Sequence, residues 1–467
     1  MALRIAIIGA GPAGCTLARI LQHKLPAAAV STTIFEADAS PDFRTQGGSL
    51  GVHDSFAQVA LKEAGLHDTF LEHARYDGEA MKLTDKNLLC YLNSAPRSHP
   101  PVENNNDNNN NNNNKTKNKR PPLAKLSKAS PEIDRAELRS LLYKSLRKDT
   151  IFWGKKAARI ERVGDGAAAR TTVHFADGSS EAGFDLVVGA DGAWSKVRPH
   201  LSSTVPFFSG IAGHSFVVPN AAVTAPDTYA LVNRGNVFSW SDGRCISLQQ
   251  LGNGNIQVAA FQVMSGPDWR NTCGYDVEDA AQVKASVERD FAGWHERLLR
   301  PIQTAAVDDA QSRVLDLYML PLGHRWTHKP GVTLIGDAAH LMTPFAGEGV
   351  NLALADSLHL ARGIIAAVNQ AGDGEGDKRA NDNDDVARAA LDGAVAAFEE
   401  DMFVRAEASQ QLTWDLMQLR FFTPGSPRTA IERMMLRHLK HRLGYWWTLL
   451  ATPLVYAYYA LFKMLWW

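Results

Sequence analysis

The glycine pattern near the N-terminus constrains the fold of this chain more than any other feature. Residues 5–8 (IAII) have the composition of a buried strand, and the pattern Gly9-x-Gly11-x-x-Gly14 follows directly. Apolar side chains at helical spacing come next, with Pro12 in the first turn of the predicted helix. In such a unit the glycines permit a tight turn, close approach of a pyrophosphate to the backbone, and close packing of helix on strand. The pattern therefore predicts a Rossmann-like α/β domain that binds a dinucleotide.

An acidic residue and two later turns narrow the choice of dinucleotide. Glu36 ends the next predicted strand, 22 residues after Gly14, where a carboxylate can accept hydrogen bonds from a ribose. A carboxylate there repels a 2′-phosphate, so we do not expect NADP in this site. Two turns, residues 191–192 (DG) and 336–337 (GD), each follow an apolar run that is typical of a buried strand. An enzyme that binds only NAD through one domain needs neither turn, and this favours FAD.

The second of these turns opens the segment 336–351 (GDAAHLMTPFAGEGVN), a glycine-rich loop that leads into a predicted helix and suits an anionic ligand. Together with the N-terminal pattern and the DG turn, this segment resembles the FAD-dependent aromatic-hydroxylase family of flavoprotein monooxygenases. The resemblance implies that the three segments meet on one FAD. It also implies that Asp337 binds its ribityl or pyrophosphate region, and that the loop from Pro344 to Asn351 lies beside the isoalloxazine ring.

Within this family the chain is similar to the tetracycline-inactivating branch over about residues 1–410, apart from the Asn-rich run and residues 373–385. That resemblance implies that Arg135 contacts FAD and that Arg44 lies near the flavin or the incoming NADPH. Gly51 stands where that branch has Asp, so only a backbone contact remains there. The polar residues that those enzymes use on tetracycline are not matched, and tetracycline is not expected as substrate. The similar segments are residues 44–53 (RTQGGSLGVH), 131–146 (PEIDRAELRSLLYKSL), 291–298 (FAGWHERL) and 336–351.

The family's chemistry sets the remaining expectations for the cofactor site. NADPH or NADH reduces FAD as a co-substrate, and O2 supplies the oxygen atom that is inserted. Because the cofactor carries this chemistry while the protein orients the substrate, no residue is assigned as catalytic. The predicted FAD-binding residues are Gly9, Gly11, Pro12, Ala13, Gly14, Glu36, Arg44, Gly48, Gly51, Arg135, Asp337, Gly347, Gly349, Val350 and Asn351.

The middle of the chain alternates short apolar runs with turn signals. Asp-Gly and Gly-Asn-Gly are typical of hairpins. We expect a sheet laid over the flavin with an apolar pocket between them, and hence a hydrophobic or aromatic substrate. Strands are predicted at 214–219, 228–233, 236–243, 245–255 and 256–263. The candidate substrate contacts, which are alternatively core side chains, are His214, Phe216, Trp240, Phe261 and Pro344.

Composition excludes other classes of protein. The 49 Lys and Arg residues nearly balance the 50 Asp and Glu residues, and no basic stripe is present, so nucleic acid is not expected as a partner. Four scattered cysteines form no CxxC pair, which predicts free thiols in a reducing, cytoplasmic compartment and no metal site. The Asn-rich run within 95–125 predicts a disordered insert, and residues 373–385 predict a second polar loop.

The C-terminal segment is both basic and apolar. Residues 428–442 carry five Lys or Arg residues and one acid, at positions that predict an amphipathic helix. Residues 445–462 carry no charge, and tryptophans flank this run. Eighteen residues are marginal for a membrane span, and Pro453 interrupts them. Two interpretations stay open: attachment to a membrane through 428–467, or a helix pair packed on the FAD-binding domain or at a dimer interface.

The predicted fold is a three-layer, Rossmann-like α/β FAD-binding domain with a β-sheet substrate domain and a C-terminal helical extension. The predicted function is an FAD-dependent monooxygenase that acts on a hydrophobic or aromatic small molecule of secondary metabolism. A flavin oxidoreductase without oxygen insertion and a non-catalytic FAD-binding protein stay open as alternatives. The FAD-binding domain is expected in the parts 1–75, 126–203 and 326–410, the substrate domain at 204–325, and the extension at 411–467.

Overall fold

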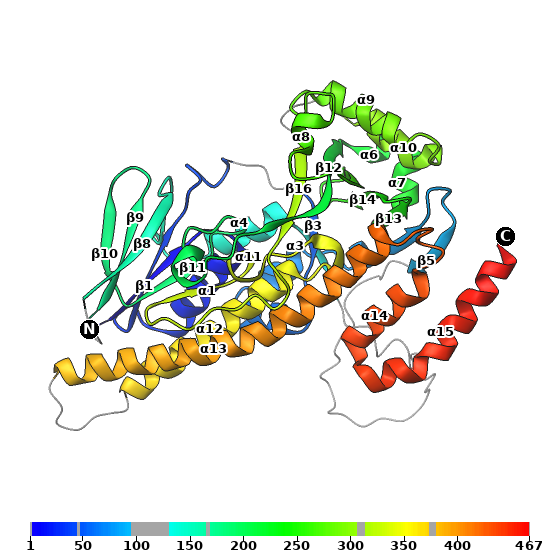
Figure 1. Cartoon of the computed structure of the whole chain (residues 1–467). Helices are drawn as coiled ribbons and strands as arrows, with labels where there is room; N and C mark the ends of the chain where they lie inside the picture. The colour runs from blue at the N-terminus through cyan, green and yellow to red at the C-terminus, as the bar shows by residue number, and fades with distance from the viewer. Residues whose placement is uncertain are drawn as a thin grey trace, which may run out of the picture.

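The computed structural model describes residues 2–43, 47–94, 130–164, 169–305, 313–372 and 380–466. Arg44 and the Asn-rich run predicted as an insert lie outside the described residues. The predicted polar loop at 373–385 does so only in part, because a long helix already begins at Ala380. The two ends of the chain lie on opposite sides of the molecule (Figure 1).

A five-stranded parallel sheet forms the centre of the first domain. Its strand order is β7-β2-β1-β11-β17, so the chain first adds strands on one side of β1 and later on the other. The carboxyl ends of β1 and β11 therefore flank the crevice where such sheets bind ligands. The predicted strands of the three cofactor segments are confirmed. The strands are β1 (Leu3–Ile8), β2 (Val30–Phe35), β7 (Ile151–Phe152), β11 (Leu186–Gly189) and β17 (Val332–Leu334).

Helices and a small antiparallel sheet flank this parallel sheet, and together the three form a three-layer domain (Figure 1). Phe35 of the parallel sheet packs on Phe175 of the antiparallel sheet, with ring centroids 4.8 Å apart. This confirms the predicted three-layer architecture. The helices are α1 (Pro12–Lys24), α2 (Phe56–Glu63), α3 (His67–His73), α4 (Arg135–Lys144), α12 (Gly349–Gly372) and α13 (Ala380–Met417), and the antiparallel strands are β8 (Ala157–Val163), β9 (Arg170–Phe175) and β10 (Ser180–Phe184).

A seven-stranded sheet, β16-β12-β15-β14-β13-β4-β5, forms the second domain. One face packs on α7 (Pro226–Val232), α9 (Ala280–Asp290) and α10 (Glu296–Thr304), and we call it the outer face. The other, the inner face, meets the C-terminal helices and the loop at Pro344–Ala346. The strands are β4 (Met81–Thr84), β5 (Cys90–Ser94), β12 (Phe207–Val218), β13 (Asn236–Ser241), β14 (Arg244–Gln250), β15 (Ile256–Val263) and β16 (Arg313–Met319).

One strand predicted for this sheet is wrong, because residues 228–233 belong to helix α7. Pro226 occupies the first helical turn, where its fixed φ favours a helix. Asn233 ends the helix in the left-handed conformation, with φ 49°. Between them Leu231 and Val232 are buried against the outer face. These start and stop signals outweigh the β propensity of the residues between them.

The C-terminal extension consists of helices, as predicted, but it begins inside a longer element. Helix α13 continues unbroken through the boundary predicted at 410/411, and it ends in a π-helical turn, Gln418–Phe422. Helices α14 (Ile431–Leu443) and α15 (Tyr445–Leu465) follow and pack on one another (Figure 1). Lys463 contacts Glu432 at 2.5 Å, and the Tyr459 hydroxyl donates to the Tyr91 carbonyl of β5 at 3.2 Å.

Candidate functional site

The turn between β1 and α1 leaves an open space that glycine alone preserves. Gly9 adopts φ 110°, and a Cβ there would lie 2.8 Å from the carbonyl carbon of Ala190. A Cβ on Gly14 would lie 3.0 Å from Ile7 Cγ2 and even closer to the Gly9 carbonyl oxygen. A Cβ on Gly11, in contrast, would meet nothing within 4 Å. The first two glycines are thus required by packing, whereas Gly11 borders empty space into which a ligand can come.

The same turn presents hydrogen-bond donors to that space. Gly11 precedes the first turn of α1 and has no side chain with which to cap it, so backbone N–H groups of this turn remain available to an anion. Glu36 lies beside the turn at the carboxyl end of β2. It is buried, and it accepts from the backbone N–H groups of Ala10 at 2.6 Å and Asp38 at 2.9 Å. A carboxylate has about four acceptor positions, so two remain for ribose hydroxyls.

Asp337 and Arg135 line a concavity next to this turn. Burial raises the pKa of Asp337 and lowers the pKa of Arg135, and each charge partly offsets the effect on the other. Both side chains are nevertheless exposed to solvent. Side chains that are surrounded by protein and still accessible lie in a cavity. Asp191 supports the same conclusion, because its buried Oδ1 has no hydrogen-bond partner among the described residues.

The Gly336-Asp337 turn is held by a buried ionic cluster. Gly336 adopts φ 62°, and its N–H donates to Asp356 Oδ2 at 3.0 Å. The same carboxylate contacts His340 Nε2 at 2.6 Å and Arg405 at 3.3 Å. Because Asp356 is fully buried, it fixes the direction in which Asp337 leaves the turn.

The loop before α12 is tied to strand β3 (Ser49–Gly51) by one amide side chain. Asn351 Nδ2 donates to the carbonyls of Gly51 at 2.9 Å and Gly347 at 3.2 Å, and its Oδ1 accepts from the His53 N–H at 2.8 Å. The first turn of α12 contains no acidic residue, so its N-terminus keeps its partial positive charge. Gly48 joins the same group of segments, since its carbonyl accepts from the Arg135 N–H at 3.0 Å.

The structure thus brings the predicted cofactor-binding residues to the carboxyl edge of the parallel sheet. The loop before α12 and the N-terminal turn meet through α12, because Ser357 donates to the Ala13 carbonyl at 2.8 Å. Pro12 and Ala13 form the first turn of α1, and Gly349 and Val350 form that of α12. Arg44 remains a prediction, because it lies outside the described residues.

The predicted substrate contacts divide between the two faces of the large sheet. Phe261 lies on the inner face, 6.0 Å from the ring of Phe345, which follows Pro344 in the loop before α12. Trp240 is also on the inner face, although it is fully buried and donates to Ser426 Oγ at 2.9 Å. The structure therefore places Phe261 beside Phe345, the residue after Pro344, and Trp240 in the same core cluster.

His214 and Phe216 lie on the outer face, and their predicted contact with substrate is not supported by this arrangement. Phe216 packs in the cluster formed with α9 and α10. His214 Nε2 lies 2.8 Å from the Tyr275 hydroxyl, and its ring packs on Trp269. Burial lowers the pKa of His214 to about 4, so this histidine is a neutral core residue. Side chains point to alternate faces along a strand, so a shift of one position in the predicted alternation reverses the face.

Several polar residues that sequence reasoning did not assign surround the loop before α12. Burial raises the pKa of Glu348 to about 7, with Arg442 partly offsetting this effect. His53 and His441 approach its carboxylate at 3.7 and 3.8 Å. The basic residues of the tail gave a signal, but it left membrane attachment and packing of the helix pair open and assigned no residue to the loop. Instead, α14 turns His441 toward the loop.

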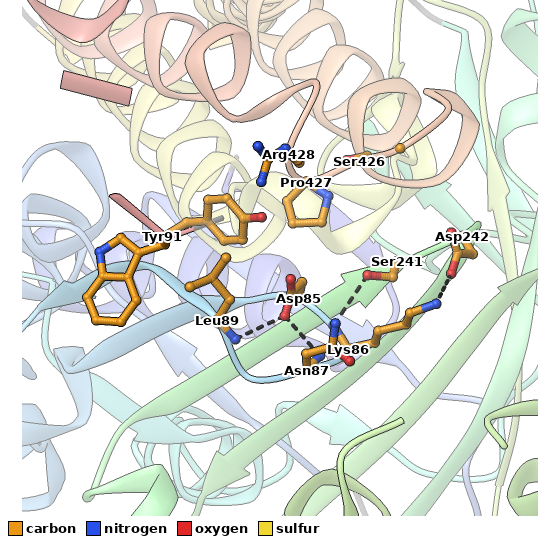
Figure 2. Close-up of a pocket in the computed structure, with 12 residues that line it drawn as sticks. Asp85, Lys86, Asn87, Leu89, Tyr91, Ser241, Asp242, Ser426, Pro427 and Arg428 are labelled. Atoms are coloured by element: carbon orange, nitrogen blue, oxygen red, sulfur yellow. Dashed lines mark hydrogen bonds and ion pairs between the residues drawn. The ribbon is translucent and has the colours of Figure 1, made fainter. Parts of the chain in front are cut away.

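A separate pocket of about 400 Å³ lies between the β4–β5 hairpin, the β13–β14 turn and residues 425–428 (Figure 2). Trp466, at the end of α15, forms part of its wall. Lys86 contacts Asp242 in its wall at 2.8 Å, and Asp85 accepts from the Asn87 and Leu89 N–H groups (Figure 2). We interpret this pocket as a gap left where the C-terminal extension packs on the seven-stranded sheet.

The parallel sheet, the open glycine turn and the concavity lined by Asp337 together define a dinucleotide-binding enzyme with a second domain over its cofactor. The family described as FAD binding domain matches residues 2–394, and the chain belongs to this family. It is an FAD-dependent monooxygenase.

Relatives and solved structures agree with this assignment. Monooxygenase penA of Penicillium thymicola is 28% identical over 463 residues, which cover 91% of this chain and 96% of penA. HpxO of Klebsiella pneumoniae complexed with FAD and uric acid has a TM-score of 0.66 at 18% identity, and the match covers 98% of this chain and 96% of HpxO. Tetracycline destructase Tet(55) has a TM-score of 0.62 at 19% identity, covering 95% of this chain and 97% of Tet(55). At such identities these two likenesses show the fold alone.

Proposed function

We propose that this monooxygenase inserts one oxygen atom of O2 into a hydrophobic or aromatic small molecule of secondary metabolism, with NADPH or NADH as reductant. The observation that carries this proposal is the group of aromatic rings packed where the inner face meets the loop before α12. The rings of Phe261 and Phe421 lie 6.0 and 4.9 Å from that of Phe345, which links the two walls. A wall of this kind favours a planar apolar substrate. HpxO, whose structure holds uric acid, supports a planar substrate by analogy.

The residues that we propose to hold FAD fit its parts in chemistry. The Gly9–Gly14 turn suits the pyrophosphate, Glu36 suits the ribose, and Arg135 and Asp337 suit the groups between ribose and ring. The N-terminus of α12, with Gly347, Gly349 and Val350, stabilises a nearby anionic group by about 0.3–1 kcal/mol. Gly48 and Gly51, through their carbonyls, and Asn351, through its side-chain amide, shape the adjoining wall. Bound FAD supplies the redox chemistry that activates O2, while the protein orients the substrate and excludes water.

Three measurements on the purified protein test this function. The visible spectrum is expected to show the two bands of bound flavin. NADPH oxidation is expected to rise with some member of a panel of aromatic and polyketide-like compounds. Oxygen from ¹⁸O2 is then expected in the product at one atom per NADPH consumed.

Other outcomes distinguish the alternatives. Substrate turnover without ¹⁸O in the product would establish an oxidoreductase that inserts no oxygen. Bound FAD without any stimulation across the panel would favour a non-catalytic FAD-binding protein. Protein that cannot be reconstituted with FAD would overturn the assignment of the cofactor site.

We further propose that α15 attaches this cytoplasmic enzyme to an anionic membrane surface. By length and composition α15 could cross a membrane. Only 6% of its most apolar window is buried within the protein, so α15 is not a core helix. One stripe, Tyr459 with Val455 and Phe462, packs inside the molecule. The remaining apolar residues are exposed, among them Trp446 (74%) and Met464 (79%). Exposed Arg and Lys residues of α14 adjoin them, and basic residues beside exposed aromatic ones are typical of a membrane interface.

Flotation with lipid vesicles tests this attachment. The wild-type protein is expected to float with vesicles containing phosphatidylserine and less with neutral phosphatidylcholine vesicles. The double variant Trp446→Ser/Trp447→Ser is expected to lose binding, whereas Trp194→Ser, which alters an exposed tryptophan of the first domain, is expected to retain it. Equal flotation of wild type and double variant would contradict the proposal. A dimer in the absence of vesicles would instead favour the packing interpretation.

A further inference from the structure

A buried cation without a counter-ion lies where the C-terminal extension meets the inner face of the large sheet. Arg420 is 7% exposed and belongs to the π-helical turn at the end of α13. Among the described residues, Arg420 forms no ion pair with a carboxylate, and its Nε has no hydrogen-bond partner. Buried arginines are ordinarily paired, and π-helical turns within α-helices occur frequently at functional sites.

Aromatic rings surround this guanidinium. It lies 5.4 Å from the ring centroid of Trp240 and 5.9 Å from those of Phe238 and Phe345. Ring faces attract a cation, and this attraction holds Arg420 in place. They do not accept the in-plane, bidentate hydrogen bonds for which a guanidinium is built. The cage therefore positions the charge and leaves its donors unused.

Two ionisable groups near Arg420, His438 and Cys245, supply no negative charge. Burial, followed by the charges of Arg420 and Arg442, lowers the pKa of His438 to about 3, so its imidazole is neutral. Burial raises the pKa of Cys245 to about 12, so its thiol stays protonated. Burial also lowers the pKa of Arg420 itself, as expected for a cation without a carboxylate beside it.

The guanidinium of Arg420 adjoins the proposed substrate region. Its Nε is buried and has no hydrogen-bond partner among the described residues. Phe345 connects it to the loop before α12, and Trp240 connects it to the inner face. Arg420 thus adjoins the same aromatic wall as Phe261, the candidate substrate contact from β15.

We propose that Arg420 determines substrate specificity by binding an anionic oxygen of the substrate, either a carboxylate or an ionised phenol or enol. This inference rests on the proposed function, whose substrate class it narrows. The planar guanidinium of an arginine can donate hydrogen bonds to both oxygens of a carboxylate, and it stabilises a phenolate or enolate over the neutral form. An ionised phenol or enol is also more electron-rich, and this favours attack on an electrophilic oxygen atom.

Matched pairs of planar ligands test the assignment in the FAD-loaded enzyme, with binding followed by the perturbation of the flavin spectrum. The first pair is 2-naphthoate and 2-naphthamide, and the second is 2-naphthol and 2-methoxynaphthalene. The acidic member of at least one pair is expected to bind wild type about tenfold more tightly than the neutral member. A preference in the first pair alone identifies a carboxylate, and one in the second identifies a phenolate or enolate.

Three variants separate this role from a structural one. Arg420→Gln is expected to lose the preference while keeping FAD, and Arg420→Lys to retain part of it through its charge. Arg433→Gln, which alters an exposed arginine of α14, is expected to behave as wild type. A purely structural Arg420 predicts a lower melting temperature with an unchanged preference. That result, or wild type without preference for either acidic ligand, overturns the inference. Failure of the proposed function itself would appear earlier, as a protein that takes up no FAD.

Discussion

Replacing Gly14 by alanine tests whether close packing of α1 on β1 supports the cofactor site. The new Cβ would lie 3.0 Å from Ile7 Cγ2, 3.4 Å from Ala190 Cβ, and far inside van der Waals distance of the Gly9 carbonyl oxygen. Ile7 can give by a few tenths of an ångström, but the Gly9 carbonyl is backbone in a constrained turn and cannot. Helix α1 therefore has to move away from β1. Such overpacking costs about 1–3 kcal/mol, and it displaces the N–H groups that face the ligand.

Gly11→Ala is the matched comparison, because it adds the same methyl group three residues earlier. No atom lies within 4 Å of the added Cβ, and the φ of −77° at this residue is ordinary for alanine. The protein without FAD should therefore keep its stability, or gain about 0.4–1 kcal/mol from a stiffer unfolded chain. The methyl group nevertheless occupies the space through which a pyrophosphate reaches the backbone. A loss of about tenfold in FAD affinity corresponds to roughly 1.4 kcal/mol.

The assay measures two quantities for each variant: the melting temperature of the FAD-free protein, and the bound flavin per chain after reconstitution. Gly14→Ala is expected to lower both, whereas Gly11→Ala is expected to lower only the second. The reasoning is refuted if Gly11→Ala binds FAD like wild type. It is also refuted if Gly11→Ala destabilises the FAD-free protein as much as Gly14→Ala does.

Three further predictions concern buried ionisable groups. Burial raises the pKa of Glu348 from 4.5 to about 7, so its contribution to the stability of the folded protein is fully present below about pH 4.5 and is lost as the pH rises to 7. The melting temperature of Glu348→Gln should therefore rise progressively above that of wild type across this window, and that of the exposed control Glu407→Gln should not. Burial lowers the pKa of His214 from 6.5 to about 4, so wild type loses stability as the pH falls through this range, and His214→Phe should flatten the acid side of its melting-temperature profile. Asp356→Ala leaves His340 without its buried partner and should cost about 3–5 kcal/mol in thermal unfolding, while unchanged melting would contradict the role of this cluster.

The cofactor half of the molecule could be predicted from the sequence because its signals are local and its backbone requirements are strict. A strand, three glycines at fixed spacing and a helix specify one geometry, and the structure shows that Gly9 and Gly14 have no room for a side chain. The later Gly336-Asp337 turn is local in the same way. What holds it is not local: Asp356 lies 20 residues further along the chain and reaches back to the Gly336 N–H. The sequence spacing of Gly336 and Asp356 does not predict this hydrogen bond, because it forms only when helix α12 packs beside the turn.

The substrate half could not be predicted to the same depth, since it depends on which face of a strand meets which neighbour. Phe216 and Phe261 are both aromatic residues in apolar strands, and their local sequences do not distinguish them. In the structure Phe216 packs under α9 and α10, while Phe261 meets Phe345. Helix α7 shows the same limit, because its residues have mixed propensity and only Pro226 and Asn233 mark its ends.

The C-terminal extension was hardest to interpret because its composition suits both a membrane surface and packing within the protein. A basic helix before an aromatic one suits a membrane interface, yet α14 also directs His438 and His441 inward, toward Arg420 and Glu348. The FAD-binding family match ends at residue 394, so Arg420, His438 and His441 come from the part of the chain beyond it, whereas Glu348 lies within it. The chemistry of O2 activation belongs to FAD and needs only the common part. Selection among substrates, however, needs contacts from the substrate side, and in this chain α14 and the π-helical turn pack against the inner face. If Arg420 acts as inferred, exchanging the extension should change which substrate is accepted while leaving FAD binding intact.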